Sequence, residues 1–233
     1  RAGFEVIGFS LGSAHTGDEY QERIKAACEC WVDASQMTDA QVVEKARALE
    51  LDIAVDLAGH TMDARTGIFA QRVAPVQVNY LGYPGSMGAA YMDVVLADES
   101  VIPPEQVSAY EEQVVYLPHG FQINDGQRRI GDIKRRTVYG LPESGLVLAS
   151  FNASYKLNPG LFDVWCRLLL SAPGAVLWLL GETPEQIQNL KNEAVRRGVS
   201  AERIVFAERM AYPEHLARYA HVDLVLDTWP FNG

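Results

Sequence analysis

The amino-acid sequence predicts an α/β protein made of two Rossmann-like parallel sheets that face a cleft. Short apolar runs of strand length alternate with segments of helical period along the whole chain. A polar, glycine-containing stretch without apolar period, residues 124–136, interrupts this alternation, which then starts again. Repeated β-α-β units on both sides of a linker indicate two lobes. We expect a first lobe over 1–123, a connection over 124–140 and a second lobe over 141–233.

Each expected element follows from a local pattern. Thr16 is expected to cap a helix with acidic residues in its first turn, and Thr38 with Gln41 fits a capping box. In the first lobe the expected strands are 4–10, 30–33, 51–56, 76–81, 92–97 and 113–117, and the expected helices are 16–28, 38–49 and 65–72. In the second lobe the expected strands are 146–151, 175–180, 203–206 and 222–226, and the expected helices are 159–170, 184–197 and 213–220.

Loops that follow the strands are the candidate site segments, because ligands of parallel sheets bind at the carboxyl ends of the strands. These loops are 57–65, 81–88, 118–124, 151–158, 207–213 and 227–233. The last of them leaves a strand followed by an open loop. We therefore expect a fragment of a longer protein, with both lobes incomplete.

The composition is that of an ordinary globular protein, with 48% hydrophobic and 21% charged residues. A formal net charge of −10 disfavours a nucleic-acid binder, which would need a broad basic face. No apolar run approaches the roughly 20 residues that cross a bilayer, so no membrane partner is expected. Three cysteines are too few for a disulfide framework, which favours a cytoplasmic setting. Cys28 and Cys30 lack a second ligand pair at metal-binding spacing, so no metal site is expected.

Lys156 is the first candidate for chemistry. It lies between a buried strand and a helix that we expect to begin near Pro159. A lysine there can reach a diphosphate held near backbone N–H groups and can stabilise its charge as it leaves. The alternative is a solvated lysine on an ordinary loop.

His215 and Arg218 form the second candidate. They are three residues apart, so they share one face of a helix whose start follows a strand and contains Pro213. That end of a helix suits ribose and phosphate oxygens. The alternative is an ordinary surface histidine and arginine.

Three further loops could line the cleft. The loop 81–88 has three glycines and a proline, which suits either a close backbone approach to a ligand or a plain tight turn. His60 and Arg65 follow one strand of the first lobe and His119 follows another. Lone histidines such as these are more often structural than catalytic.

Taken together, several segments resemble the catalytic region of the O-GlcNAc transferases. The motifs Leu-Gly-Tyr-Pro-Gly at 81–85 and Phe-Asn-Ala-Ser-Tyr-Lys at 151–156 carry most of the resemblance. The other matching segments, in the order of the family, are 56–65, 74–80, 116–119, 176–180, 214–218 and 226–233.

The resemblance implies a GT-B fold and transfer of N-acetylglucosamine from UDP-GlcNAc to serine or threonine hydroxyls of proteins, with inversion, no metal and no cofactor. It implies that Lys156 contacts the diphosphate and that His215 and Arg218 belong to the nucleotide site. Further residues implied at the nucleotide are Ala153, Met210, Ala211 and Tyr212. Those expected toward the sugar and the acceptor are Leu81, Gly82, Tyr83, Pro84, His60, Arg65 and His119.

The sequence also departs from the family. Ala153 replaces the usual glutamine, and Tyr212 stands where animal members carry a lysine beside the uridine. The short connection at 124–136 lacks the insert of animal members, which suggests a bacterial-type protein. The family's catalytic-region histidines and tetratricopeptide helices would precede Arg1, and its His-Thr-Thr motif would follow Gly233, so we expect the fragment alone to be inactive. Two alternatives stay open: a GT-B enzyme with another acceptor, and a tetratricopeptide-linked protein that binds UDP but is inactive.

Overall fold

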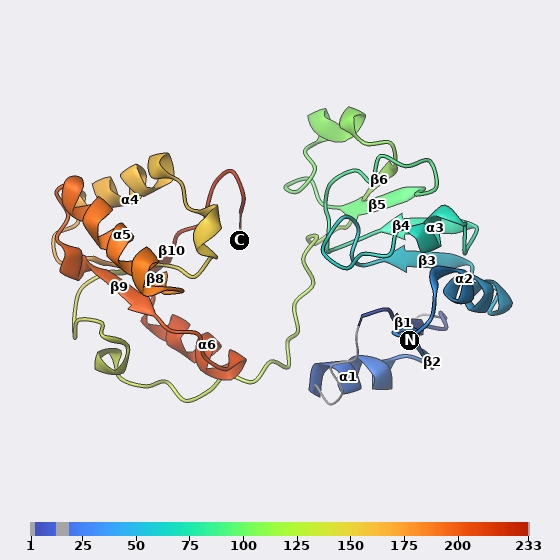
Figure 1. Ribbon diagram of the computed structural model, residues 1–233, viewed down its shortest axis with the longest axis horizontal. Helices are drawn as coiled ribbons and strands as arrows, with labels where there is room; N and C mark the ends of the chain where they lie inside the picture. The colour runs from blue at the N-terminus through green and yellow to red at the C-terminus, as the bar shows by residue number, and fades with distance from the viewer. Residues whose placement is uncertain (1–2, 13–18, 233) are drawn as a thin grey trace. The chain divides into compact units, whose positions relative to one another are not determined.

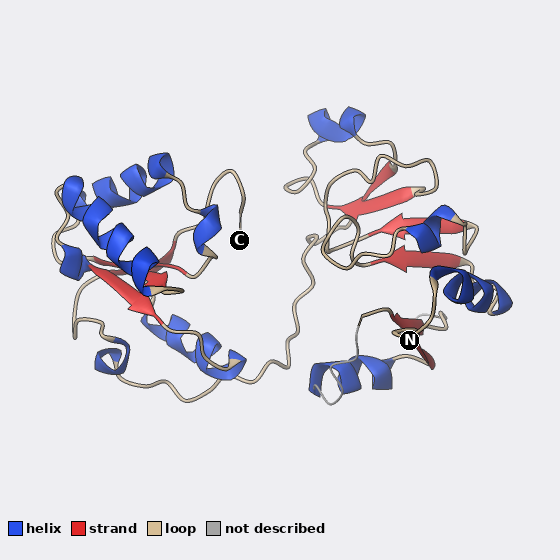
Figure 2. Cartoon of the chain, viewed as in Figure 1, coloured by secondary structure: helices blue, strands red, loops and turns tan. Residues whose placement is uncertain are grey.

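The computed structural model describes residues 3–12 and 19–232, so the predicted cap at Thr16 lies outside the described residues. The chain divides into two compact units, an N-terminal unit over Arg1–Asn124 and a C-terminal unit over Asp125–Gly233 (Figure 1). Strands and helices alternate in both units (Figure 2), which confirms the predicted α/β class. No helix among the described residues is long and apolar enough to cross a membrane.

The N-terminal unit is built on a four-stranded parallel sheet in the order β3-β4-β5-β6. Contrary to the expectation of one sheet per lobe, the first two strands pair only with each other, in parallel, within the described residues. The strands are β1 (Ile7–Ser10), β2 (Cys30–Asp33), β3 (Ile53–Asp56), β4 (Val76–Asn79), β5 (Val94–Ala97) and β6 (Gln113–Tyr116). The helices are α1 (Glu19–Ala27), α2 (Asp39–Ala48), α3 (Gly67–Ala70) and the 3₁₀ helix η1 (Pro104–Ala109).

Helix α2 begins where the sequence predicts. Thr38 accepts from the Gln41 backbone N–H and Gln41 caps the Thr38 backbone in return, which confirms the capping box. The predicted helix 65–72 is only the single turn of α3. It cannot continue because Arg72 has a φ of 56°, in the left-handed region that a right-handed helix excludes.

The C-terminal unit holds a second parallel sheet, in the order β10-β7-β8-β9. Its strands are β7 (Val147–Ser150), β8 (Val176–Leu180), β9 (Ile204–Ala207) and β10 (Leu224–Val225). Its helices are α4 (Pro159–Ser171), α5 (Pro184–Arg196), α6 (Tyr212–Arg218) and the 3₁₀ helices η2 (Arg136–Tyr139), η3 (Ser154–Lys156), η4 (Ala201–Arg203) and η5 (Tyr219–His221).

Strand β8 is the centre of this unit. All five of its residues are buried, because α4 and α5 cover one face of the sheet and Tyr139 and Val222 pack on the other. Burial on both faces explains why the strand is a continuous apolar run rather than an alternating one.

The strand order creates a topological switch point. From β7 the chain proceeds outward through β8 to β9, and it then returns to place β10 on the other side of β7. The loops that leave the neighbouring strands β7 and β10 therefore meet at the carboxyl edge of the sheet, where ligands of such sheets bind.

Arg203, just before β9, joins the end of α4 to the start of β8 by hydrogen bonds. Its guanidinium donates to the carbonyl oxygens of Ala175 at 2.7 Å, Leu169 at 2.7 Å and Ala172 at 2.8 Å, at the end of α4 and the start of β8.

We expect Arg203→Met to lower the free energy of unfolding by about 1–3 kcal/mol, because carbonyl groups at the end of α4 lose a charged donor. Urea unfolding followed by tryptophan fluorescence measures the change. Arg196→Met is the control, since that side chain is 75% exposed and its loss should cost about 0.5 kcal/mol or less. Equal losses in both variants would contradict the assigned role.

Candidate active site

Polar side chains join the two loops at the switch point of the C-terminal unit. The Asn152 amide, just after β7, donates to Asp227 Oδ1 and to Thr228 Oγ1, both at 3.0 Å. The Asn232 amide donates to Asp227 Oδ2 at 3.0 Å and to the Thr228 carbonyl at 2.9 Å. Thr228 is fully buried. These hydrogen bonds hold the loop after β10 against the loop after β7.

Lys156 lies inside this arrangement, at the end of η3. Its ammonium donates to the Asn232 carbonyl at 2.5 Å and lies 4.1 Å from the centre of the Phe231 ring. No carboxylate pairs with Lys156 in the part of the chain that the structure describes, so its charge is not neutralised there. The side chain is half-buried. A half-buried point charge of this kind favours an anionic ligand.

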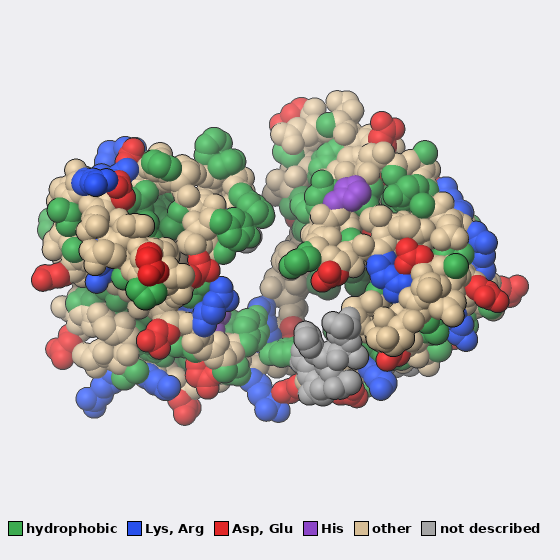
Figure 3. Space-filling view, viewed as in Figure 1, with side chains coloured by type: hydrophobic (Ala, Val, Ile, Leu, Met, Phe, Trp, Pro, Cys, Tyr) green, Lys and Arg blue, Asp and Glu red, His purple; other side chains and the backbone are tan. Residues whose placement is uncertain are grey.

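Exposed aromatic side chains lie on the two loops that meet at the lysine. Tyr155 is 74% exposed, Trp229 70% and Phe231 59%, and hydrophobic side chains gather on this part of the C-terminal unit (Figure 3). Ala153, immediately before η3, contributes only its backbone, whose carbonyl accepts from the Lys156 N–H at 3.0 Å. The lysine is thus the one cation of this loop, between apolar surfaces.

Arg218 is buried, with only 2% of its surface exposed. Its guanidinium stacks 4.1 Å from the Phe151 ring centre and donates to the Glu208 carbonyl at 2.9 Å. It also donates to Nδ1 of His215. Because a guanidinium has donors only, that nitrogen of His215 must be the acceptor, and the proton of the neutral ring is on Nε2.

His215 is enclosed by aromatic rings. Phe151 and Tyr219 meet it edge-on, with ring centres 5.6 and 5.2 Å away, and Tyr212 stacks at 6.5 Å. Burial, followed by the nearby charge of Arg218, lowers the pKa of His215 below its ordinary value. The ring therefore offers a neutral N–H donor. The two residues predicted to share a helix face are in contact, but Arg218 acts on its surroundings mainly through His215 and Glu208.

The loop after β9 holds the segment predicted near the uracil. Met210 is 36% exposed and Tyr212 is 41% exposed. The Ala211 carbonyl accepts from the His215 N–H at 2.9 Å, and Arg128 donates to the Tyr212 hydroxyl at 3.1 Å. Arg128 belongs to the segment that was predicted to connect the two lobes. That part of the segment lies in the C-terminal unit and contacts this loop.

The loop after β4 in the N-terminal unit is held in place by hydrogen bonds to its backbone carbonyls. Asn79, which is fully buried, donates to the carbonyls of Tyr83 at 2.9 Å and Gly85 at 3.3 Å. Leu81 has a φ of 74°, and a side chain at Gly82 would overlap the Leu57 carbonyl. The Pro84 carbonyl accepts from the Tyr110 hydroxyl at 2.8 Å. The close approach that Gly82 permits is therefore to the protein's own backbone.

His60 belongs with this loop. Its Nε2 donates to the Met87 carbonyl at 3.1 Å, and its ring meets Tyr83 edge-on at 5.3 Å. His119 follows β6, at the opposite edge of the sheet from β3 and His60, and is exposed. The structure therefore brings His60 to the loop after β4 and leaves His119 apart from it.

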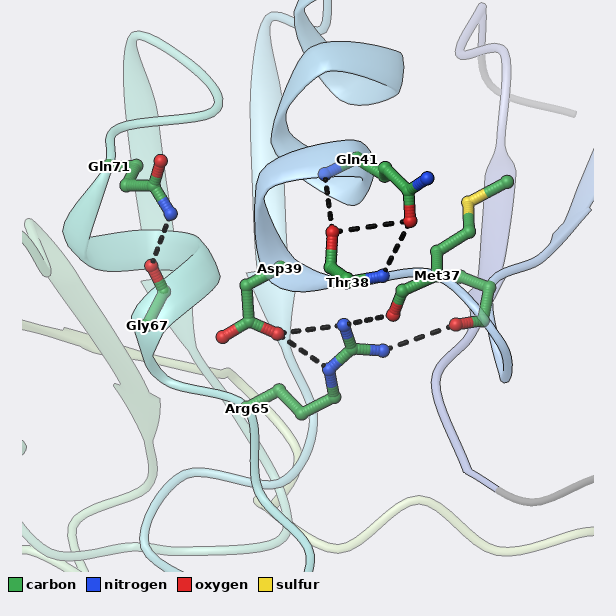
Figure 4. A network of polar contacts seen from close by, with 8 residues as sticks. Met37, Thr38, Asp39, Gln41, Arg65, Gly67 and Gln71 are labelled. Carbon is green, nitrogen blue, oxygen red and sulfur yellow. Dashed lines mark hydrogen bonds and ion pairs between the residues drawn. The ribbon is translucent and has the colours of Figure 1, made fainter.

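Arg65 binds the first residue of α2 and the loop that precedes this helix. Its guanidinium donates to Asp39 Oδ1 at 2.8 Å and to the carbonyls of Ala34 at 3.2 Å and Met37 at 2.7 Å (Figure 4). Its side chain is 18% exposed. These contacts use the charge to fix the loop between β2 and α2, and no role toward a ligand follows from them.

Sequence reasoning missed Glu182, which follows β8. Its carboxylate accepts from the Ser154 backbone N–H at 3.1 Å, from the Ser154 hydroxyl, and from Arg209 at 3.2 Å. The signal was present, since an acid lies two residues after the most apolar strand, but the loop after that strand was not among the predicted site segments. In the described part of the chain, no cluster of histidine, cysteine or carboxylate groups could hold a metal ion.

The C-terminal unit is thus a parallel α/β sheet with a lysine on the loop after β7 and a donor imidazole on helix α6. The model of glycosyl transferase family 41 matches residues 1–138 and 132–233. The chain therefore belongs to glycosyl transferase family 41, which confirms the predicted family and the GT-B type of fold.

Curated relatives agree with this assignment. The chain is 34% identical over 239 residues to the probable UDP-N-acetylglucosamine–peptide N-acetylglucosaminyltransferase SEC of Arabidopsis thaliana, covering 100% of this chain and 24% of the relative. It is 23% identical to the corresponding transferase of Caenorhabditis elegans, over 346 positions that cover 100% of this chain and 30% of the relative. The longer alignment means that the worm protein carries inserted residues that this chain lacks.

Solved structures extend the comparison. The O-GlcNAc transferase of Thermobaculum terrenum, solved as a K341M mutant, superposes with a TM-score of 0.84 at 29% identity, over 98% of this chain and 43% of the other. Anabaena HepE, solved with UDP and glucose, has a TM-score of 0.56 at 16% identity, over 94% of this chain and 65% of the other, and shows the shared fold alone. The chain spans about a quarter of the length of its plant relative.

We expect nitrogen NMR of His215 at pH 7.5 to show a neutral ring with its proton on Nε2, because Arg218 occupies Nδ1. Lowering the pH should leave the ring neutral until below the ordinary pKa of about 6.5. Since the folded-state pKa is depressed, the stability that His215 contributes is complete above the ordinary pKa of about 6.5 and is lost as the pH falls from there through the lower folded-state pKa. A proton on Nδ1, or titration above 6.5, would contradict this assignment.

Proposed function

We propose that the whole protein transfers N-acetylglucosamine from UDP-GlcNAc to serine or threonine hydroxyls of proteins, by inversion and without a metal. The observation that carries the proposal is Lys156, an ammonium with no carboxylate partner among the described residues, at the switch point of a family 41 chain. The plant and worm relatives are UDP-N-acetylglucosamine–peptide N-acetylglucosaminyltransferases, the plant one probable, which supports this donor and this class of acceptor.

Lys156 supports departure of a diphosphate. Cleavage of the bond from the sugar to the diphosphate leaves negative charge on the diphosphate oxygens, and a fixed cation beside them stabilises that charge. The lysine thereby supplies the charge compensation that a divalent metal supplies elsewhere. We propose that, when the donor binds, Lys156 exchanges its hydrogen bond to the Asn232 carbonyl for one to a phosphate oxygen.

His215 supports recognition of the nucleoside. Its Nε2–H is a donor for an oxygen of the uridine, and the exposed ring of Tyr212 stacks beside it. Ala153 and Tyr212 provide neither the amide nor the ammonium that the resemblance places there, so the remaining contacts carry more of the affinity. The loop that contains Tyr83 is proposed to lie toward the sugar and the acceptor.

Tetratricopeptide helices that present the acceptor, a bacterial origin and a cytoplasmic setting are further parts of this proposal. The short connection at 124–136 supports the bacterial origin, and the small number of cysteines supports the cytoplasmic setting.

We expect Lys156→Met in the full-length protein to weaken UDP binding about 10- to 100-fold, because a charge-assisted hydrogen bond contributes about 1.5–3 kcal/mol. Isothermal titration calorimetry measures the affinity. Lys45→Met, an exposed position on α2, is the matched control and should bind as the wild type does. An affinity that Lys156→Met leaves unchanged would refute the donor site.

We expect the full-length protein to transfer radiolabelled N-acetylglucosamine from UDP-GlcNAc to a serine-containing peptide, and Lys156→Met to reduce the rate by at least about 10-fold. Scintillation counting of the captured peptide measures the transfer. UDP binding without any transfer to peptides or proteins would favour the inactive binding protein instead.

A further inference from the structure

Glu182 lies outside the predicted site but reaches into it from the loop after β8. Its side chain is 23% exposed. Its backbone N–H donates to Gln186 Oε1 at 2.8 Å, and the Gln186 amide donates to the Leu180 carbonyl at 3.1 Å. Thr183 caps the same helix, α5, by accepting from the Gln186 N–H at 3.2 Å. These hydrogen bonds fix the backbone of Glu182 between the buried strand β8 and the capped helix α5.

The carboxylate of Glu182 joins the loops after three neighbouring strands. It accepts from the Ser154 N–H and hydroxyl, which belong to the loop after β7, and from Arg209, which belongs to the loop after β9. Hydrogen bonds from Ser154 are the main cause of its lowered pKa, so the group is ionised at neutral pH. Two of the donors come from one residue, so Ser154 is the principal partner of the acid.

Ser154 and Lys156 are the two ends of one turn. The Lys156 N–H donates to the Ala153 carbonyl and the Leu157 N–H to the Ser154 carbonyl, both at 3.0 Å, which closes η3. A displacement of Ser154 therefore moves the backbone of Lys156 with it. The acid binds the beginning of the turn, while the lysine projects from its end.

We propose that Glu182 is a positioning residue that holds Lys156 where the leaving diphosphate forms, an inference that rests on the proposed function. Displacement of a catalytic group by about 1 Å is enough to reduce a rate substantially. Glu182 itself does not touch the diphosphate. Its effect on the donor passes through Ser154 and η3 to Lys156.

The test is a double-mutant cycle in the full-length protein, with UDP affinity from calorimetry and kcat and KM for UDP-GlcNAc. Glu182→Gln removes the charge but keeps the shape, and we expect it to weaken UDP binding about 10-fold and to lower kcat. In the Lys156→Met background the same substitution should have no further effect, because nothing remains to be positioned. Glu185→Gln, an exposed acid in the first turn of α5, is the control and should match the wild type.

Ser154→Ala is the second variant, since it removes one donor and keeps the backbone contact. It should weaken UDP binding in the same direction but less, and thermal unfolding of all variants reports whether they fold. Losses from Glu182→Gln and Lys156→Met that simply add, or a Glu182→Gln variant that binds UDP normally while Lys156→Met does not, would overturn this inference alone. Absence of UDP binding by the wild type would overturn the proposed function as well.

Discussion

The parallel order β10-β7-β8-β9 is the constraint on which the candidate site depends. Adjacent parallel strands end at one edge, so residues distant in the sequence are collected there without any dedicated scaffold. Asn152 then joins the loops after β7 and β10, and Glu182 joins those after β7, β8 and β9. Lys156 is held by both sets of contacts. Its position is therefore a property of the whole sheet edge rather than of its own loop.

The two arginines that the sequence offered as site residues illustrate a different use of charge. Arg65 donates to an aspartate and to two backbone carbonyls, and Arg218 donates to a carbonyl and to His215 while stacking on Phe151. In both cases the planar fork of donors organises neighbouring backbone or side chains. The residues that remain able to meet a ligand are those whose polar atoms these arginines leave available, such as Nε2 of His215.

Much of the fold could be predicted because it is encoded locally. Continuous apolar runs marked β7 and β8, and the pattern at Thr38 marked the start of α2. Pairing is not local, so the separate sheet of β1 and β2 could not be foreseen. The same limit applied to the site. Lys156 and His215 could be predicted as site residues from their positions after strands and from the family motifs. The hydrogen bond that Ser154 donates to Glu182 could not, because it spans 28 residues and forms only when β7 and β8 are paired.

Trp178 gives the molecule an internal optical reporter. The indole is fully buried on β8, its ring centre lies 5.0 Å from that of Phe151, and the Arg218 guanidinium is 5.7 Å away. A cation this close to an excited indole alters its emission, and Phe151 and Arg218 both contact His215. A ligand that contacts His215 is therefore expected to change the emission of Trp178, one of the four tryptophans of the chain, and intrinsic fluorescence measures that change without a label.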